Sequence, residues 1–104
     1  MKGRMAYLTP EKAIGKQTIL SDVVYNCNFL SYDEIRESIF VELTQAELCD
    51  VSLDVIYDCR VIGENDITQI KAKIIDRYDG KSGKILMLKI VEGFYKIPIN
   101  KVDK

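Results

Sequence analysis

The feature that most constrains this chain is an alternation of apolar and polar residues in its second half. Between residues 51 and 62 apolar side chains occupy every second position, and they are Val51, Leu53, Val55, Tyr57, Cys59 and Val61. A period of two places such side chains on one face of a pleated strand. The pattern continues through short turns to residue 99 and predicts a small antiparallel β-domain.

Strand-forming segments separated by turns also cover the first half of the chain. β-Branched and aromatic residues are typical of strands, and the expected strands are residues 17–30, 36–43, 51–62, 67–78, 84–91 and 94–99. Thr9-Pro10-Glu11 is typical of a helix start, with threonine as the N-cap and proline in the first turn. A short N-terminal helix or turn, ended by Gly15, is therefore expected.

Residues 31–44 fit both a helix and a strand. Ser31 and Glu34 have the spacing of a capping box, and Ile35, Ile39 and Leu43 follow at helical spacing. The run from residue 38 to residue 44 is equally typical of a strand. A turn at residues 31–35 and a strand at 36–43 are favoured, with a helical turn at 44–47. The helical alternative would give an α+β sandwich.

Face parity predicts the pairing within the hairpin of residues 51–78. A tight loop at residues 63–66 pairs Ile62 with Ile67. Counting away from that loop gives the further pairs Cys59 with Ile70, Tyr57 with Ala72, Val55 with Ile74 and Asp58 with Lys71. The last of these pairs predicts a cross-strand ion pair on the opposite face.

Two registers compete in the next hairpin, whose turn lies at residues 79–83. Pairing Asp79 with Lys84 would bury the side chain of Lys89. Pairing Asp79 with Gly83 buries Leu88 in its place, because a slip of one residue exchanges the two faces of a strand. The second register is therefore expected. Its further pairs are Ile74 with Leu88, Ala72 with Ile90, and Lys73 with Lys89. The last pair places two like charges opposite each other, and the nearby Asp54 is expected to reduce their repulsion.

The opposite face of these strands is not cleanly polar. It carries Ile56, Ile62, Ile67, Ile75, Ile85, Met87 and Val91. A sheet with one face in water usually alternates more cleanly, so either the sheet curls into a barrel covered by N-terminal segments or a partner covers it. The expected fold is mainly β, a small antiparallel split β-barrel of about six strands, forming a single domain over residues 1–104.

Charge and hydropathy exclude several classes of function. The net charge is −1, with acidic and basic residues interspersed, whereas nucleic-acid-binding domains usually carry a clear basic excess. No apolar run approaches the length of about 20 residues that spans a bilayer, and no apolar signal region follows the basic N-terminus. The expected location is the cytoplasm, with neither nucleic acid nor membrane as a partner.

No residue pattern indicates catalysis, a metal or a cofactor. The chain has no histidine, and its cysteines, Cys27, Cys49 and Cys59, form no C-x-x-C pair, so they are expected to be buried hydrophobic side chains. Gly80-Lys81-Ser82 resembles the end of a phosphate loop, but Ile75 stands where the first glycine belongs and a strand follows. The aspartates at residues 50, 54 and 58 lie too far apart along a strand to chelate one ion.

The order of segments from residue 15 to residue 90 resembles that of PilZ-type β-barrels, and more closely the split-barrel domain that often precedes PilZ. The matching segments are an early strand at residues 18–29, an Ile- and Val-rich strand at 38–43, a long hairpin at 51–78 and a strand ending in Leu86-Met87-Leu88-Lys89-Ile90. The resemblance implies a small β-barrel.

The family motifs for cyclic di-GMP, R-x-x-x-R followed by [DN]-x-S-x-x-G, are present only in part. Asp50-Val51-Ser52 matches the start of the second motif, but Val55 stands where its glycine belongs, and Arg4 and Arg36 are isolated. The resemblance therefore implies a degenerate, non-catalytic member that acts through protein contacts and does not bind cyclic di-GMP directly.

The leading hypothesis is a non-catalytic cytoplasmic module that regulates or binds a protein partner, or binds itself as a homodimer. Its contact surface would comprise outward apolar residues and the last strand, residues 94–99, where Pro98 favours a sheet edge. The residues named for this surface are Ile56, Ile75, Met87, Phe94 and Tyr95.

The alternative hypothesis is a small-barrel receptor for a nucleotide or a flavin, which the resemblance to split barrels also implies. It predicts a basic cluster on one face of the sheet. The candidate ligand-binding residues are Lys71, Lys73, Arg77 and Lys89.

Overall fold

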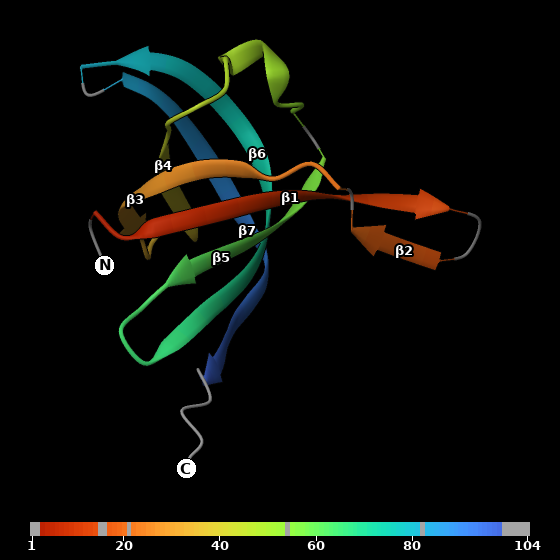
Figure 1. The fold of residues 1–104 in the computed structure, drawn as a ribbon. Helices are drawn as coiled ribbons and strands as arrows, with labels where there is room; N and C mark the ends of the chain where they lie inside the picture. Colours follow the sequence, from red (N-terminus) through yellow and green to blue (C-terminus); the bar gives the residue numbers. More distant parts are fainter. Residues whose placement is uncertain (1–2, 15–16, 21, 54, 82, 99–104) are drawn as a thin grey trace.

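The computed structural model describes residues 3–14, 17–20, 22–53, 55–81 and 83–98 of the chain. These residues form strands and one short 3-10 helix (Figure 1), namely β1 (Met5–Ile14), β2 (Gln17–Leu20), β3 (Tyr25–Asp33), β4 (Ser38–Leu43), η1 (Leu48–Asp50), β5 (Ile56–Ile62), β6 (Asp66–Gly80) and β7 (Gly83–Pro98). The predicted mainly-β class is confirmed.

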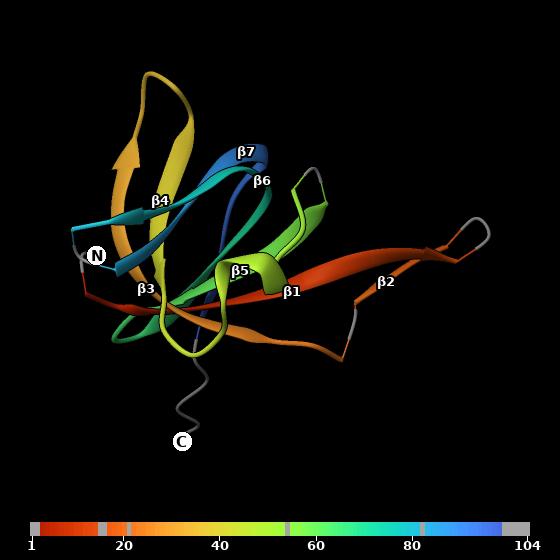
Figure 2. The ribbon, with the colours of Figure 1, turned by 90° about the horizontal axis from the view of Figure 1, so that it is seen from above.

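Six strands form a closed antiparallel barrel in the order β1–β3–β4–β7–β6–β5. The ring closes because β5 pairs back onto β1, with Ala6 opposite Val61 and Leu8 opposite Cys59. Figures 1 and 2 show the strands curving around a common interior. Closure gives wall strands a neighbour on both sides, and the predicted β-barrel is confirmed. Within the described residues, β2 pairs only with the end of β1 and lies outside the ring.

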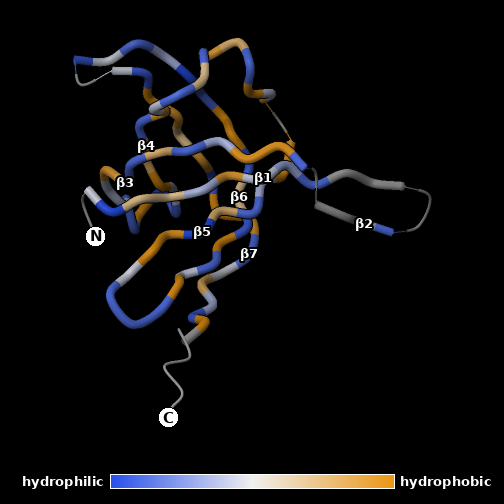
Figure 3. Tube along the Cα trace, viewed as in Figure 1, coloured by the Kyte–Doolittle hydropathy of each residue, from blue (hydrophilic) through white to orange (hydrophobic). Residues whose placement is uncertain are grey.

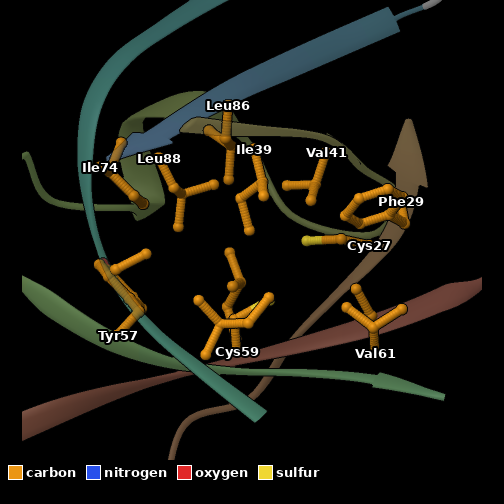
Figure 4. Close-up of a cluster of buried hydrophobic side chains, with 14 of the residues drawn as sticks. Cys27, Phe29, Ile39, Val41, Tyr57, Cys59, Val61, Ile74, Leu86 and Leu88 are labelled. Carbon is orange, nitrogen blue, oxygen red and sulfur yellow. The ribbon is translucent and has the colours of Figure 1, made fainter. Parts of the chain in front are cut away.

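Alternate side chains of the barrel strands point inward and form the core. Leu8, Ile39, Ile74 and Leu88 are each 0% exposed, and Figure 4 shows side chains from facing strands meeting in the interior. Burying one such side chain contributes about 1.5–3 kcal/mol. Hydrophilic residues gather instead at the β5–β6 turn (Figure 3).

The predicted N-terminal helix or turn is wrong, because these residues belong to β1. Ala6 and Leu8 alternate as buried core residues, and β1 pairs with both β3 and β5. This tertiary pairing overrides the weak local signal of a threonine before a proline. Pro10 takes the last position of the β1–β5 pairing, where a missing N–H costs least. Gly15 lies outside the described residues.

Residues 31–44 form strands rather than a helix, which settles the alternative left open by the sequence. β3 continues to Asp33 and a turn at 34–37 leads into β4, so the turn lies later than predicted. The N–H of Arg36 donates to Asp33 Oδ1 at 3.2 Å, and Glu37 has a φ of 50°. Ile35 is 95% exposed at this turn, so it shares no face with the buried Ile39. The helical turn predicted at residues 44–47 occurs later, as η1.

Several predicted strand bounds differ from the observed ones, including those of β4 and β6, which were expected at residues 36–43 and 67–78. The segment 17–30 divides into β2 and β3 around residues 22–24, with Ser21 outside the described residues. The segments 84–91 and 94–99 are one strand, β7, up to Pro98, and Ile99 is not described. β5 begins at Ile56 and not at residue 51.

Side chains, and not a strand ladder, hold residues 48–53. The hydroxyl of Tyr25 donates to the carbonyl of Asp50 at 2.8 Å, and the N–H of Ser52 donates to the hydroxyl of Tyr57 at 3.1 Å. Val51 is buried, whereas Leu53 is 43% exposed. The alternation in the sequence therefore begins five residues before the observed strand.

The register of the β5–β6 hairpin is as predicted. Its pairs include Ile62 with Ile67, Cys59 with Ile70, Tyr57 with Ala72 and Asp58 with Lys71. The predicted pairing of Val55 with Ile74 does not form, because Val55 precedes β5.

The β6–β7 hairpin combines the two registers that the sequence set against each other. At its tip Asp79 pairs with Lys84 and Gly80 with Gly83, so the predicted pairing of Asp79 with Gly83 is wrong. Deeper in the barrel the pairs are the predicted Ile74 with Leu88, Ala72 with Ile90 and Lys73 with Lys89. A β-bulge at Ile75 absorbs the difference of one residue. The Gly80–Gly83 segment is thus a hairpin turn and not a phosphate loop, and Ser82 lies outside the described residues.

Candidate functional site

The four cations proposed as a ligand site do not share one face. Lys73 and Lys89 are paired neighbours on β6 and β7, and Lys71 lies two residues before Lys73 on the same strand. Arg77, however, pairs with the fully buried Leu86. The bulge at Ile75 reverses the parity of β6 beyond it, so Arg77 lies on the opposite side from the lysines.

Arg77 serves the fold. Its Nη1 donates to the carbonyl of Leu48 at 3.0 Å and also to the carbonyl of Val51. These hydrogen bonds therefore connect η1 and Val51 to the part of β6 near the tip of the β6–β7 hairpin. A planar guanidinium holds its donors in fixed directions, which suits it to bind two carbonyls at once. Nη1 of Arg77 is therefore engaged within the chain.

Two of the lysines also have partners within the chain. Lys89 Nζ donates to the carbonyl of Arg36 at 2.8 Å and lies 3.8 Å from Glu37 Oε1, at the β3–β4 turn. Lys71 Nζ lies 3.1 Å from Glu11 Oε2, and the hydrogen bond to this carboxylate raises the pKa of Lys71. Among the described residues, the side chain of Lys73 has no hydrogen bond or ion pair. Its predicted neighbour Asp54 is not described.

Asp58 is a buried carboxylate that the sequence predicted as a solvated partner of Lys71. Its exposed fraction is 2%. Asp58 Oδ2 accepts from Arg60 Nε at 2.9 Å, and Oδ1 accepts from Gln69 Nε2 at 2.6 Å. Both oxygens are thus satisfied by neighbours on β5 and β6, and Lys71 turns to Glu11 instead. Sequence reasoning missed a signal here. Arg60 lies two residues along the strand from Asp58, and Gln69 is the cross-strand partner of Arg60.

The residues proposed as an interaction surface lie in two separate places. Met87 pairs with Phe40 of β4 and with Asp76 of β6, next to the bulge at Ile75. Since their sequence neighbours point into the core, Phe40 and Met87 point outward. Ile75 is 42% exposed, and Phe40 and Met87 are half-buried. We call Phe40, Ile75 and Met87 the outer apolar patch. Ile56 is half-buried and pairs with Lys73 nearby.

Phe94 and Tyr95 belong to the distal part of β7. The ring of Phe94 meets that of Tyr32 edge to face, with centroids 5.3 Å apart and planes at 87°. Tyr95 donates its hydroxyl to Glu92 Oε2 at 3.1 Å, and this carboxylate raises the pKa of Tyr95. Both side chains are about half-exposed, at 44% and 51%.

The cysteines differ from one another. Cys27 and Cys59 are buried as predicted, and burial raises the pKa of both thiols, that of Cys27 to about 12. Since the thiolate is the nucleophile, neither is a reactive group. Cys49 lies in η1 and is exposed, which corrects the expectation that all three are buried. Within the described ranges, no three His, Cys, Asp or Glu residues are grouped so as to hold a metal ion.

These observations define a closed six-stranded antiparallel barrel with an outer apolar patch, in which the four predicted cations of the described chain do not form one cluster. Comparisons with protein-family models, with curated proteins and with solved structures find no match to this chain. In the part of the chain that the structure describes, no helix is long and apolar enough to cross a membrane.

Proposed function

We propose that this protein is a non-catalytic interaction module that regulates a protein partner in the cytoplasm. The outer apolar patch carries the proposal. Apolar residues on the outer wall of a closed barrel cannot join its core, and apolar surface left in water favours a protein contact. Nucleic acid, membrane and directly bound cyclic di-GMP are not part of this proposal.

The chemistry around the patch indicates what kind of protein would bind there. Lys73 lies on β6 two residues before Ile75 of the patch, and its side chain has no ion-pair partner among the described residues. Lys89, its neighbour on β7, is already engaged at the β3–β4 turn. A partner that buries an apolar side chain against Met87 and places a carboxylate near Lys73 would fit this part of the wall. Such a contact does not need the engaged head groups of Lys71, Arg77 or Lys89, which a nucleotide or flavin receptor would use.

Site-specific photo-crosslinking tests this proposal. A photoreactive phenylalanine analogue at Met87 is expected to give a discrete adduct with one protein in the native cells, and Ile75→Glu in the same chain is expected to reduce that adduct at least tenfold, since it places a charge in the patch. The matched control carries the analogue at Ile35, which is 95% exposed but lies at the β3–β4 turn. Adducts of equal yield at both positions, or none at Met87, would contradict the proposal.

A further inference from the structure

The last part of β1 and the whole of β2 form an arm outside the barrel. Residues 5–10 of β1 pair with β3 and β5, whereas residues 11–14 pair, among the described residues, only with β2. Figures 1 and 2 both show this two-stranded arm projecting away from the ring. A hairpin of two strands is marginally stable in water by itself, so the arm is a place where a third strand would add stability.

The outer edge of β2 and that of the distal part of β7 both lack a neighbouring strand among the described residues, and the two edges differ in chemistry. The distal part of β7 is interrupted by two register shifts opposite residues 69–72, and it carries Lys96 and Pro98. Bulges, lysine and proline are the features with which proteins prevent edge pairing. β2 has none of them: its register with β1 is unbroken over four pairs, and its sequence, Gln-Thr-Ile-Leu, is uncharged.

Within the described part of the chain, the backbone of β2 has groups that pair with no other strand. Two residues separate Ile14 from its partner Gln17, and a two-residue hairpin joins a pair that exchanges both backbone hydrogen bonds. Because such pairs alternate along antiparallel strands, the backbone N–H and C=O groups of Thr18 and Leu20 face away from β1. These groups are the donors and acceptors for another strand.

We propose that β2 pairs antiparallel with β2 of a second copy of this chain, giving a four-stranded ribbon β1–β2–β2–β1 across a two-fold axis. In such a contact the same residues meet on both sides, so a charged edge would repel itself, and the uncharged β2 does not. Four residues per copy make a small interface, so the dimer is concentration-dependent. This inference is independent of the outer apolar patch.

Sedimentation of the full chain tests the dimer. The wild type is expected to pass from monomer to dimer as its concentration rises into the millimolar range. Thr18→Asp and Thr18→Lys each place like charges near the two-fold axis and are expected to weaken association at least tenfold. An equimolar mixture of these two variants is expected to associate at least as tightly as the wild type, because opposite charges then meet.

The controls separate pairing through β2 from other effects. Lys96→Asp, on the edge of β7, is expected to leave association unchanged, and the restored mixture shows that both Thr18 variants are folded. A wild type that stays monomeric at every concentration, a Thr18→Asp variant that associates like the wild type, or a mixture no tighter than its components would overturn the proposal.

Discussion

Replacement of Leu88 by alanine is expected to lower the free energy of unfolding by about 2–5 kcal/mol, as for leucines truncated in other tightly packed cores. Leu88 is 0% exposed and lies opposite Ile74 inside the barrel. Removing the branched end of Leu88 leaves a cavity. The surrounding strands cannot move in to fill it, because β7 is hydrogen-bonded to β4 on one side and to β6 on the other. Urea denaturation of the variant and the wild type measures the difference.

The same substitution tests the bulge at Ile75. If the register of the hairpin tip continued along the whole strand, Lys89 would face the core and Leu88 would face water. Ile75→Ala is the control, since Ile75 is 42% exposed and its truncation is expected to change stability by no more than about 0.5 kcal/mol. Equal losses from the two substitutions would contradict the bulged register.

Arg77→Ala is expected to destabilise the protein by about 1.5–3 kcal/mol, the usual contribution of hydrogen bonds from a charged group. The substitution leaves the carbonyls of Leu48 and Val51 without this donor, and Val51 is buried. Arg77→Lys is expected to recover only part of the loss, because an ammonium lacks the planar fork of the guanidinium. Thermal and urea unfolding provide the measurement.

Lys73→Ala is the matched control for Arg77, on the same strand. Since Lys73 has no partner among the described residues, its removal is expected to change stability by no more than about 0.5 kcal/mol. If Arg77→Ala were as harmless as Lys73→Ala, Arg77 would be a free surface cation, and its assignment to the fold would be wrong.

The sequence predicted those parts of the fold that depend on alternation. The period of two gave the β class, and face parity gave the pairing of Cys59 with Ile70, because every member of such a pair must satisfy the same buried face. The apolar residues on the opposite face led to the expectation of a barrel covered by N-terminal segments or of a covering partner. The barrel forms, but β1 is part of its wall, and Ile75 stays on the outer surface. Each of these features is recorded in many residues at once, so a single misleading residue does not change the prediction.

The failures come from features that single residues decide. A bulge adds one residue at a point that no local pattern marks, and at Ile75 it moved Arg77 away from the lysines. β1 carries a helix-start signal at Thr9 and Pro10, which was outweighed by pairing with β5, a strand far away in sequence. The burial of Asp58 was missed although Arg60 lies two residues along the strand and the predicted register places Gln69 opposite Arg60.

An NMR titration of isotope-labelled protein with cyclic dinucleotides, mononucleotides and flavin mononucleotide tests most directly the claim that Lys71, Arg77 and Lys89 are engaged within the chain and that the barrel cations form no anion site. The expected result is that no ligand shifts the amide signals of Lys73, Arg77 or Lys89 in a saturable way. Saturable shifts that converge on these residues, and that disappear in a Lys73→Glu variant, would contradict the claim and make the protein a small-molecule receptor.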